Sequence, residues 1–122
     1  MLQRKENIIQ IKTEAYAARI VKLYTYLRDV KHEQTLSKQI LRSGTSIGAN
    51  TAESRNAQSK ADFINKLSIA LKEADETIFW LKTLHSGKYI TEKQMKSMIS
   101  DNEEIIRILV KIIKTSKENI QP

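Results

Sequence analysis

The chain has no cysteine, three glycines and a single proline, and each shortage removes a class of protein. Without cysteine there is no disulfide framework and no thiolate chemistry. Glycine and proline mark turns, so their scarcity leaves few signals for a many-stranded fold. No apolar run approaches the roughly 20 residues of a membrane span, and the start MLQRKENIIQIK lacks the apolar segment of a signal peptide. We therefore expect a soluble, cytoplasmic protein.

Positive charge is abundant and concentrated in the first half of the chain. The formal net charge is +7; residues 1–60 hold eleven Lys and Arg against five Asp and Glu, whereas residues 61–122 hold ten against nine. A basic excess in one half favours a polyanionic partner, nucleic acid first. The alternative is a well-solvated surface that has no such partner.

Apolar residues recur at helical spacing in four segments separated by short breaks. The pattern predicts helices over residues 9–31, 36–55, 60–85 and 92–115, with a frayed tail over 116–122. Ser59–Asp62 and Thr91–Gln94 resemble capping boxes, and Gly87 lies where a left-handed C-terminal cap would follow the third helix. Helices of this length with short connections pack as antiparallel neighbours. The sequence therefore predicts one all-α domain over residues 1–122, an antiparallel up-down four-helix bundle.

The second segment, LSKQILRSGTSIGANTAE (residues 36–53), combines large apolar residues with small ones at regular spacing. Gly44, Gly48 and Ala52 follow at steps of four residues, so on a helix they form one strip that other backbones can approach closely. Each glycine destabilises a helix interior by about 1 kcal/mol relative to alanine. A loop at SGTSIG is therefore the alternative, although the regular apolar spacing favours a helix.

Basic residues of the first two predicted helices form the candidate nucleic-acid site. Rows of lysine and arginine on neighbouring helices can follow a phosphate backbone without reading bases. The alternative is that outer faces of helices are ordinarily charged, although acids are scarce in this half. A second basic run, at 107–117, follows acids at 101–104, an order that helix-dipole complementation explains. The candidate residues are Lys12, Arg19, Lys22, Lys38, Arg42, Arg55 and Lys60.

Catalytic and metal-binding chemistry have few candidate residues. His32 and His85 each lie at a predicted helix C-terminus, where a cation complements the helix dipole. Asp29-x-x-His32 resembles half of a di-metal bundle site, but no second half falls on a core stripe. Gly44-x-x-x-Gly48 is not followed by the Gly-Lys-Ser/Thr of a phosphate-binding loop. We therefore predict neither an enzyme, nor a metal site, nor a cofactor.

The outer face of the third predicted helix carries apolar residues that a monomer does not need. Ile69, Phe79 and Trp80 project away from the core stripe on a helical wheel, and exposed aromatics beside an aliphatic residue are typical of protein interfaces. The alternative is that a neighbouring loop covers Trp80. On the fourth helix, Asn102 lies at the centre of the apolar stripe, where a buried asparagine fixes helix register. The outward residues favour self-association.

Three segments in order, LSKQILRSGTSIGAN, NAQSKADFINKLSIALKEADET and WLKTL, resemble the bacterial four-helix bundle proteins encoded in intervening sequences of 23S rRNA genes. The resemblance runs over nearly the whole chain. It implies a four-helix bundle that assembles into a homopentamer, with no known catalytic residues. The chain is also similar to the accessory proteins of diversity-generating retroelements, pentameric bundles that associate with nucleic acid and a reverse transcriptase.

These observations together predict a non-enzymatic homo-oligomer, a pentamer by the resemblance, that binds RNA or DNA through basic faces of the first two helices. The alternative is a protein-interaction scaffold whose oligomer docks a polypeptide partner, with charge serving solubility. A metal-dependent bundle enzyme is a more distant third reading.

Overall fold

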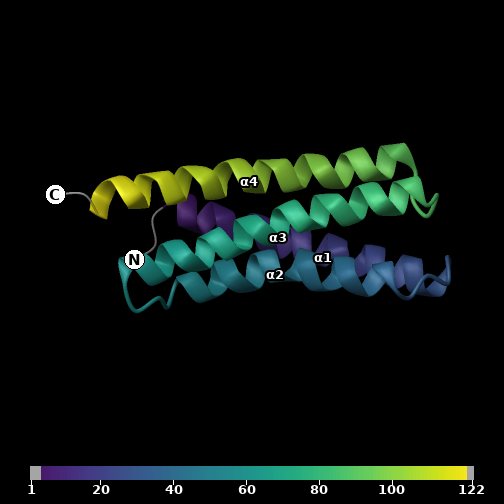
Figure 1. Ribbon diagram of the computed structural model, residues 1–122, viewed down its shortest axis with the longest axis horizontal. Coiled ribbons are helices and arrows are strands. Elements are labelled where there is room, and N and C mark those ends of the chain that lie inside the picture. The colour runs from purple at the N-terminus through teal and green to yellow at the C-terminus, as the bar shows by residue number, and fades with distance from the viewer. Residues whose placement is uncertain (1–3, 121–122) are drawn as a thin grey trace.

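The part of the chain that the structure describes forms four long helices (Figure 1). The computed structural model describes residues 4–120, with side-chain positions for residues 8–118. Its elements are α1 (Arg4–Asp29), α2 (Leu36–Ser54), α3 (Lys60–Ser86) and α4 (Glu92–Ile120). Each helix packs on its neighbours in sequence and α4 packs on α1, whereas the backbones of the diagonal pairs lie farther apart within the described residues. The prediction of an all-α, up-down four-helix bundle is confirmed.

The fourth helix is longer than the apolar pattern predicts. α4 continues to Ile120, and Ser116 is buried against the bundle. The prediction that the tail frays from residue 116 is therefore wrong for residues 116–120, which continue α4 as helix. Residues 121–122 lie outside the described residues.

α2 is one continuous helix through both of its glycines, so the loop alternative at SGTSIG is wrong. A Cβ at Gly44 would lie 2.6–2.9 Å from three side-chain atoms of Ile20 in α1, and one at Gly48 would lie 3.4 Å from Thr13 of the same helix. The small-residue strip therefore faces α1 and lets the two backbones approach. The close packing this allows outweighs the low helix propensity of glycine.

The core runs the length of the bundle and includes a buried polar pair, Asn102 of α4 and Tyr16 of α1. Asn102 is fully buried, as predicted. Its Nδ2 donates to Tyr16 Oη at 3.2 Å, and Tyr16 Oη donates to the carbonyl oxygen of Met98 at 3.1 Å. These bonds join α1 to α4. The largest fully buried apolar side chains are Ile9, Ile20, Leu27, Ile40, Ile47, Leu67, Leu81, Leu84, Ile105 and Leu109.

The turn after α3 has its left-handed residue one position later than predicted. Gly87 has a φ of −80°, whereas Lys88 has a φ of 66°. The N–H of Tyr89 donates to Leu84 O and that of Lys88 donates to His85 O, both at 2.9 Å. This is the bonding of a Schellman motif with lysine in place of glycine. The prediction for Gly87 is wrong because α3 runs one residue beyond its expected end.

Both predicted capping boxes close helix starts. The N–H of Asp62 donates to Ser59 Oγ at 3.0 Å at the start of α3. At the start of α4, the N–H of Gln94 donates to Thr91 Oγ1 at 3.1 Å, and that of Thr91 donates to Gln94 Oε1 at 2.8 Å. Each box satisfies N–H groups that a helix start leaves without a partner in its own helix.

The start of α2 is closed by Glu33, a role that helical spacing does not reveal. Its Oε2 accepts the N–H of Thr35 at 3.1 Å and that of Leu36 at 3.0 Å, and its Oε1 accepts that of Ser37 at 2.7 Å. Thr35, in the N-cap position, makes no side-chain capping bond. A carboxylate here also complements the positive end of the helix dipole.

Glu33→Ala is expected to lower the free energy of unfolding by about 1–3 kcal/mol, because three backbone donors lose a charged acceptor. Urea unfolding followed by circular dichroism measures this difference. Thr35→Ala is the matched control and should change stability by less than about 0.5 kcal/mol, since its side chain caps nothing. Similar losses in the two variants would contradict the assignment of the cap to Glu33.

Candidate functional site

The candidate cations on α1 are partly balanced by acids of α4. Lys12 Nζ lies 3.1 Å from Glu104 Oε1, and Arg19 Nη1 lies 2.6 Å from Asp101 Oδ2. Arg19 Nη2 also donates to Ser97 Oγ at 3.1 Å. The row of positive charge that α1 shows in sequence is therefore partly neutralised once α4 packs beside it.

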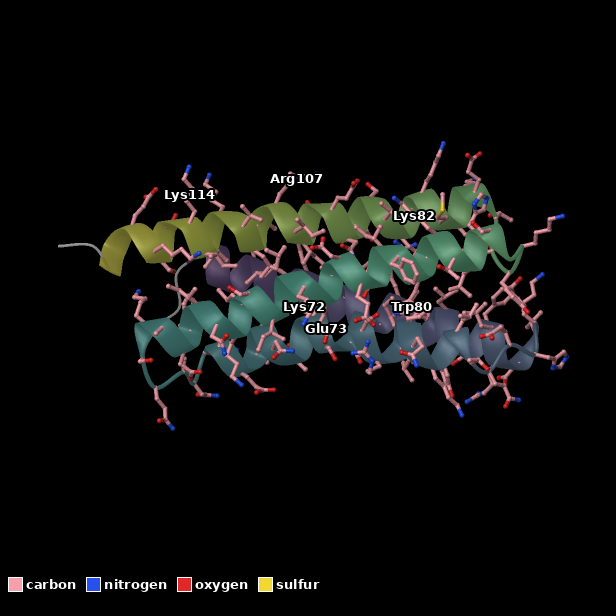
Figure 2. All side chains as sticks on the ribbon, viewed as in Figure 1. Lys72, Glu73, Trp80, Lys82, Arg107 and Lys114 are labelled. Carbon is pink, nitrogen blue, oxygen red and sulfur yellow. The ribbon has the colours of Figure 1, made fainter. Side chains whose placement is uncertain are left out.

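The candidate cation Arg42 on α2 is paired with acids of α3. Its Nη1 lies 3.3 Å from Glu73 Oε1, and its Nη2 donates to Glu76. Trp80 Nε1 donates to Glu76 Oε2 at 2.9 Å, and Figure 2 shows Glu73 and Trp80 on α3, on its side toward α2. Arg42 was predicted for the nucleic-acid site and Trp80 for the oligomer interface, but both donate to the carboxylate of Glu76.

The remaining four candidates, Lys22, Lys38, Arg55 and Lys60, are exposed and make no ion pair with described residues. Lys22 and Lys38 lie toward the α1–α2 connection, whereas Arg55 and Lys60 flank the α2–α3 connection at the opposite end. Lys60 Nζ lies 5.9 Å from the centroid of the Phe63 ring. The structure therefore does not gather the seven predicted cations into one cluster.

A second basic surface lies on α4. It is the basic run of residues 107–117, whose order helix-dipole complementation was expected to explain. Its cations are exposed, and none makes an ion pair within the described residues, while Asp101 and Glu104 are engaged by α1. Figure 2 shows Arg107 and Lys114 pointing outward from α4. The spacing of three and four residues places the members on one face, a signal that was readable in sequence. They are Arg107, Lys111, Lys114 and Lys117.

The predicted interface residues of α3 differ in exposure. Phe79 is 59% exposed, whereas Trp80 packs partly against the core. The two rings meet edge to face, with centroids 5.0 Å apart. Ile69 is half-buried. The expectation that Trp80 projects away from the core is therefore wrong, because its indole lies along the bundle surface and bonds to Glu76.

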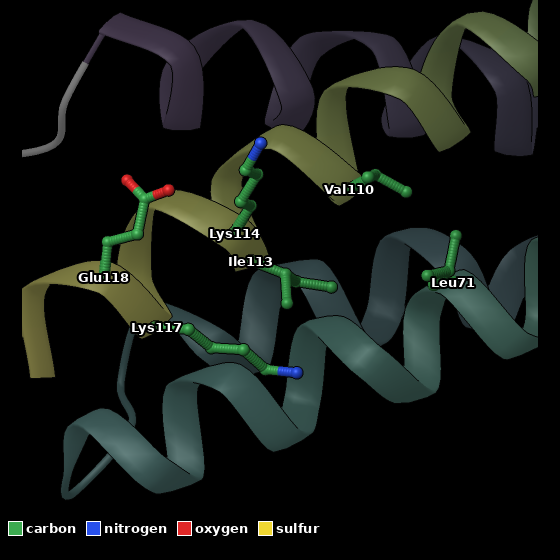
Figure 3. A pocket seen from close by; sticks show the side chains of 6 residues that line it. All are labelled: Leu71, Val110, Ile113, Lys114, Lys117 and Glu118. Carbon is green, nitrogen blue, oxygen red and sulfur yellow. The ribbon is translucent and has the colours of Figure 1, made fainter. Parts of the chain in front are cut away.

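An open groove of about 470 Å³ lies between α3 and the last turns of α4 (Figure 3). Its apolar part is formed by Leu71, Val110 and Ile113, of which Val110 is 46% exposed. Lys114, Lys117 and Glu118 form its charged rim. The groove is a second apolar surface, separate from Phe79.

Two classes of site receive no support from residues 4–120. Among the side chains that the structure describes, no group of three His, Asp or Glu could hold a metal ion, and no helix of residues 4–120 has the length and apolarity to cross a membrane. Asp29, the carboxylate of the Asp29-x-x-His32 pattern, is engaged by its neighbour in sequence. It accepts two hydrogen bonds from Arg28, at 2.7 and 3.1 Å. That guanidinium holds the pKa of Asp29 below its ordinary value.

Comparison with known proteins agrees with the sequence resemblance. The family described as 23S rRNA-intervening sequence protein matches residues 5–111. A solved structure from Bacteroides thetaiotaomicron, of a protein with unknown function from the S23 ribosomal protein family, is 54% identical with a TM-score of 0.89. The matched region covers 90% of this chain and 98% of the chain in that structure. No functionally curated protein matches. The chain belongs to the 23S rRNA-intervening sequence protein family.

Proposed function

We propose that this protein is a non-enzymatic homo-oligomer that binds RNA or DNA through exposed cations of α1, α2 and the α2–α3 connection. The observation that carries the proposal is the basic excess of residues 1–60. Four of its cations, Lys22, Lys38, Arg55 and Lys60, are exposed without an ion pair in the described part of the chain. Such cations release counterions from phosphates without reading sequence. The family name, which refers to 23S rRNA, is compatible with an RNA partner.

The test replaces three of these cations at once, in Lys22→Gln/Lys38→Gln/Lys60→Gln. Affinity for structured RNA, single-stranded DNA and duplex DNA is measured by electrophoretic mobility shift at about 50 and about 200 mM salt. Wild-type affinity should fall steeply with salt. The triple variant should bind about tenfold or more weakly at low salt, and its salt slope should fall by about 2 to 3, since each lost phosphate contact removes about 0.7–0.9.

Two further triple variants have the same net charge as the first. Replacing Lys72, Lys82 and Lys93 by glutamine removes exposed cations of α3 and of the first turn of α4, and should leave binding nearly unchanged. Loss as large as in the first variant would mean that total charge alone acts. Loss confined to a Lys111, Lys114 and Lys117 variant would move the site to α4 and contradict the proposed surface. Absence of wild-type binding at low salt would remove the proposal.

The homo-oligomer is proposed from the exposed aromatic side chain of Phe79 and from the family resemblance, which implies a pentamer. Phe79→Glu should lower the mass measured by light scattering, because burying a carboxylate in an apolar contact is strongly unfavourable. Ile11→Glu, at a 66% exposed apolar residue of α1, is the matched control and should keep the wild-type mass. An unchanged mass for Phe79→Glu would exclude this side chain from the interface.

The second candidate function is a scaffold whose oligomer docks a polypeptide, with charge serving solubility. The groove between α3 and α4 favours it, since an apolar floor with a charged rim suits an amphipathic segment. An oligomer that binds no nucleic acid at low salt would favour this scaffold over the first proposal.

A further inference from the structure

A pocket of about 200 Å³ lies at the end of the bundle where α3 turns into α4. The α1–α2 connection lies at the same end, as Figure 1 shows. Residues far apart in sequence therefore meet there. The lining includes Tyr26, Lys31, His85, Lys88, Tyr89 and Thr91.

Positive charge in this pocket has no acid beside it. Lys31 and Lys88 are exposed, make no ion pair with described residues, and no Asp or Glu lines the pocket. The acids close in sequence are engaged elsewhere. Asp29 pairs with Arg28, Glu33 accepts the N–H groups of α2, and Glu92 lies 3.5 Å from Lys96. The pocket therefore favours an anion.

The backbone at Lys88 supports a role for its ammonium group. A φ of 66° is the left-handed conformation, which costs a residue other than glycine or asparagine about 1–2 kcal/mol. Glycine at this position would make the same turn without that cost. Complementing the C-terminal dipole of α3 needs a cation but does not need a left-handed lysine in the lining of a pocket. Strain of this kind is often found at functional sites.

Two tyrosines give the pocket aromatic walls. Tyr26 and Tyr89 are half-buried, and each packs partly against the core while also lining the pocket. Aromatic rings beside cations are the usual elements that hold nucleobases next to their phosphates. The volume is below the roughly 300–1,000 Å³ of small-molecule pockets. It suits one phosphate group with a partly exposed base more than an enclosed cofactor.

We propose that this end pocket binds a nucleotide, with its phosphate among Lys31, His85 and Lys88 and its base against a tyrosine ring. Two sources present this chemistry, a free nucleoside monophosphate and the phosphorylated end of a nucleic-acid strand. For the strand, the inference rests on the function proposed above.

The test is an NMR titration of labelled protein with adenosine monophosphate, uridine monophosphate and inorganic phosphate. Saturable amide shifts are expected around Lys31 and over residues 85–94, with a Kd of about 1 mM or tighter for the nucleotides. Lys31→Gln/Lys88→Asn should weaken binding at least about tenfold; asparagine accepts the left-handed backbone, so the turn is kept. Tyr89→Leu should lower nucleotide affinity to that of inorganic phosphate, since the aromatic face is lost.

The control pair Lys72→Gln/Lys82→Gln removes the same net charge from the exposed face of α3 and should bind as the wild type does. Equal weakening in the two pairs, or no saturable shift with any of the three ligands, would overturn the proposal. A mobility shift with 5′-phosphorylated and 5′-hydroxyl oligonucleotides separates the two sources. Preference for the phosphorylated end, lost in Lys31→Gln/Lys88→Asn, indicates the strand; nucleotide binding without that preference indicates the free nucleotide.

The two proposals can fail separately. Nucleic-acid binding that is insensitive to the pocket variant, together with no nucleotide binding, would remove the pocket and leave the proposed function intact. Nucleotide binding without any affinity for RNA or DNA would support the pocket and contradict the proposed nucleic-acid function.

Discussion

Gly44→Ala is expected to lower the free energy of unfolding by about 1–2 kcal/mol, although alanine is the better helix former. The added Cβ would lie 2.6–2.9 Å from Cγ1, Cδ1 and Cγ2 of Ile20, and Ile20 is fully buried. Two of these atoms are bonded to a branched Cβ and cannot swing away independently. Overpacking of this kind costs about 1–3 kcal/mol, and the gain in helix propensity of about 1 kcal/mol offsets only part of it.

The same strip supplies the control, because Gly48→Ala should stabilise the protein by about 0.5–1 kcal/mol. Its added Cβ would meet Thr13 at 3.4 Å, an ordinary van der Waals distance, so the propensity gain remains. Urea unfolding followed by circular dichroism measures both variants. If they change stability with the same sign and size, close packing on Ile20 is not what requires Gly44.

A double-mutant cycle tests the contact itself. Ile20→Ala removes all three opposing atoms and by itself should cost about 2–5 kcal/mol. In that background Gly44→Ala should become neutral or stabilising, which gives a coupling of about 1–3 kcal/mol. Additive effects would mean that Gly44 is needed for another reason.

The second large effect is a loss of stability at alkaline pH through Tyr16. Burial raises the pKa of this phenol from 10.0 to about 12, because the phenolate would lose its hydration inside the bundle. The neutral form is thus favoured in the folded state. The corresponding stabilisation is fully present below pH 10 and is lost as pH rises toward 12. A shift of two units corresponds to about 2.7 kcal/mol.

Comparison of the wild type with Tyr16→Phe isolates this group from the lysines, which also titrate at alkaline pH. At pH 7 the variant should be less stable by about 1–2 kcal/mol, since it loses the bonds to Met98 and Asn102. Near pH 12 the order should reverse, because only the wild type must ionise a buried phenol. Urea unfolding at several pH values gives the difference, and a difference that stays constant across this range would contradict the account.

The fold followed from the sequence because its signals are local. Apolar spacing and the boxes at Ser59 and Thr91 each depend on residues within one or two turns. Asn102 was placed in the core from its position in one apolar stripe. Glu33 was missed because its role depends on the conformation of a connection, which periodicity does not describe.

The candidate site could be predicted from the sequence much less completely than the fold, because the pairing of charged side chains is not local. Arg19 and Asp101 are 82 residues apart, and Arg42 meets acids 31 and 34 residues away. A helical wheel shows which face of a helix is charged but not which neighbouring face lies beside it. Once α4 packs on α1, Asp101 and Glu104 partly neutralise the first row of cations, whereas the cations that follow these acids on α4 make no ion pair within the described residues.

The sequence alone therefore determined the number of helices, their antiparallel order and the strip of small residues, since the energies that favour these act within single segments. Only the tertiary structure decided which cations remain free, how far Trp80 is buried, and that Lys31 and Lys88 line one pocket. Those outcomes depend on how each helix is rotated about its own axis, and that rotation is fixed by the packing of all four helices together.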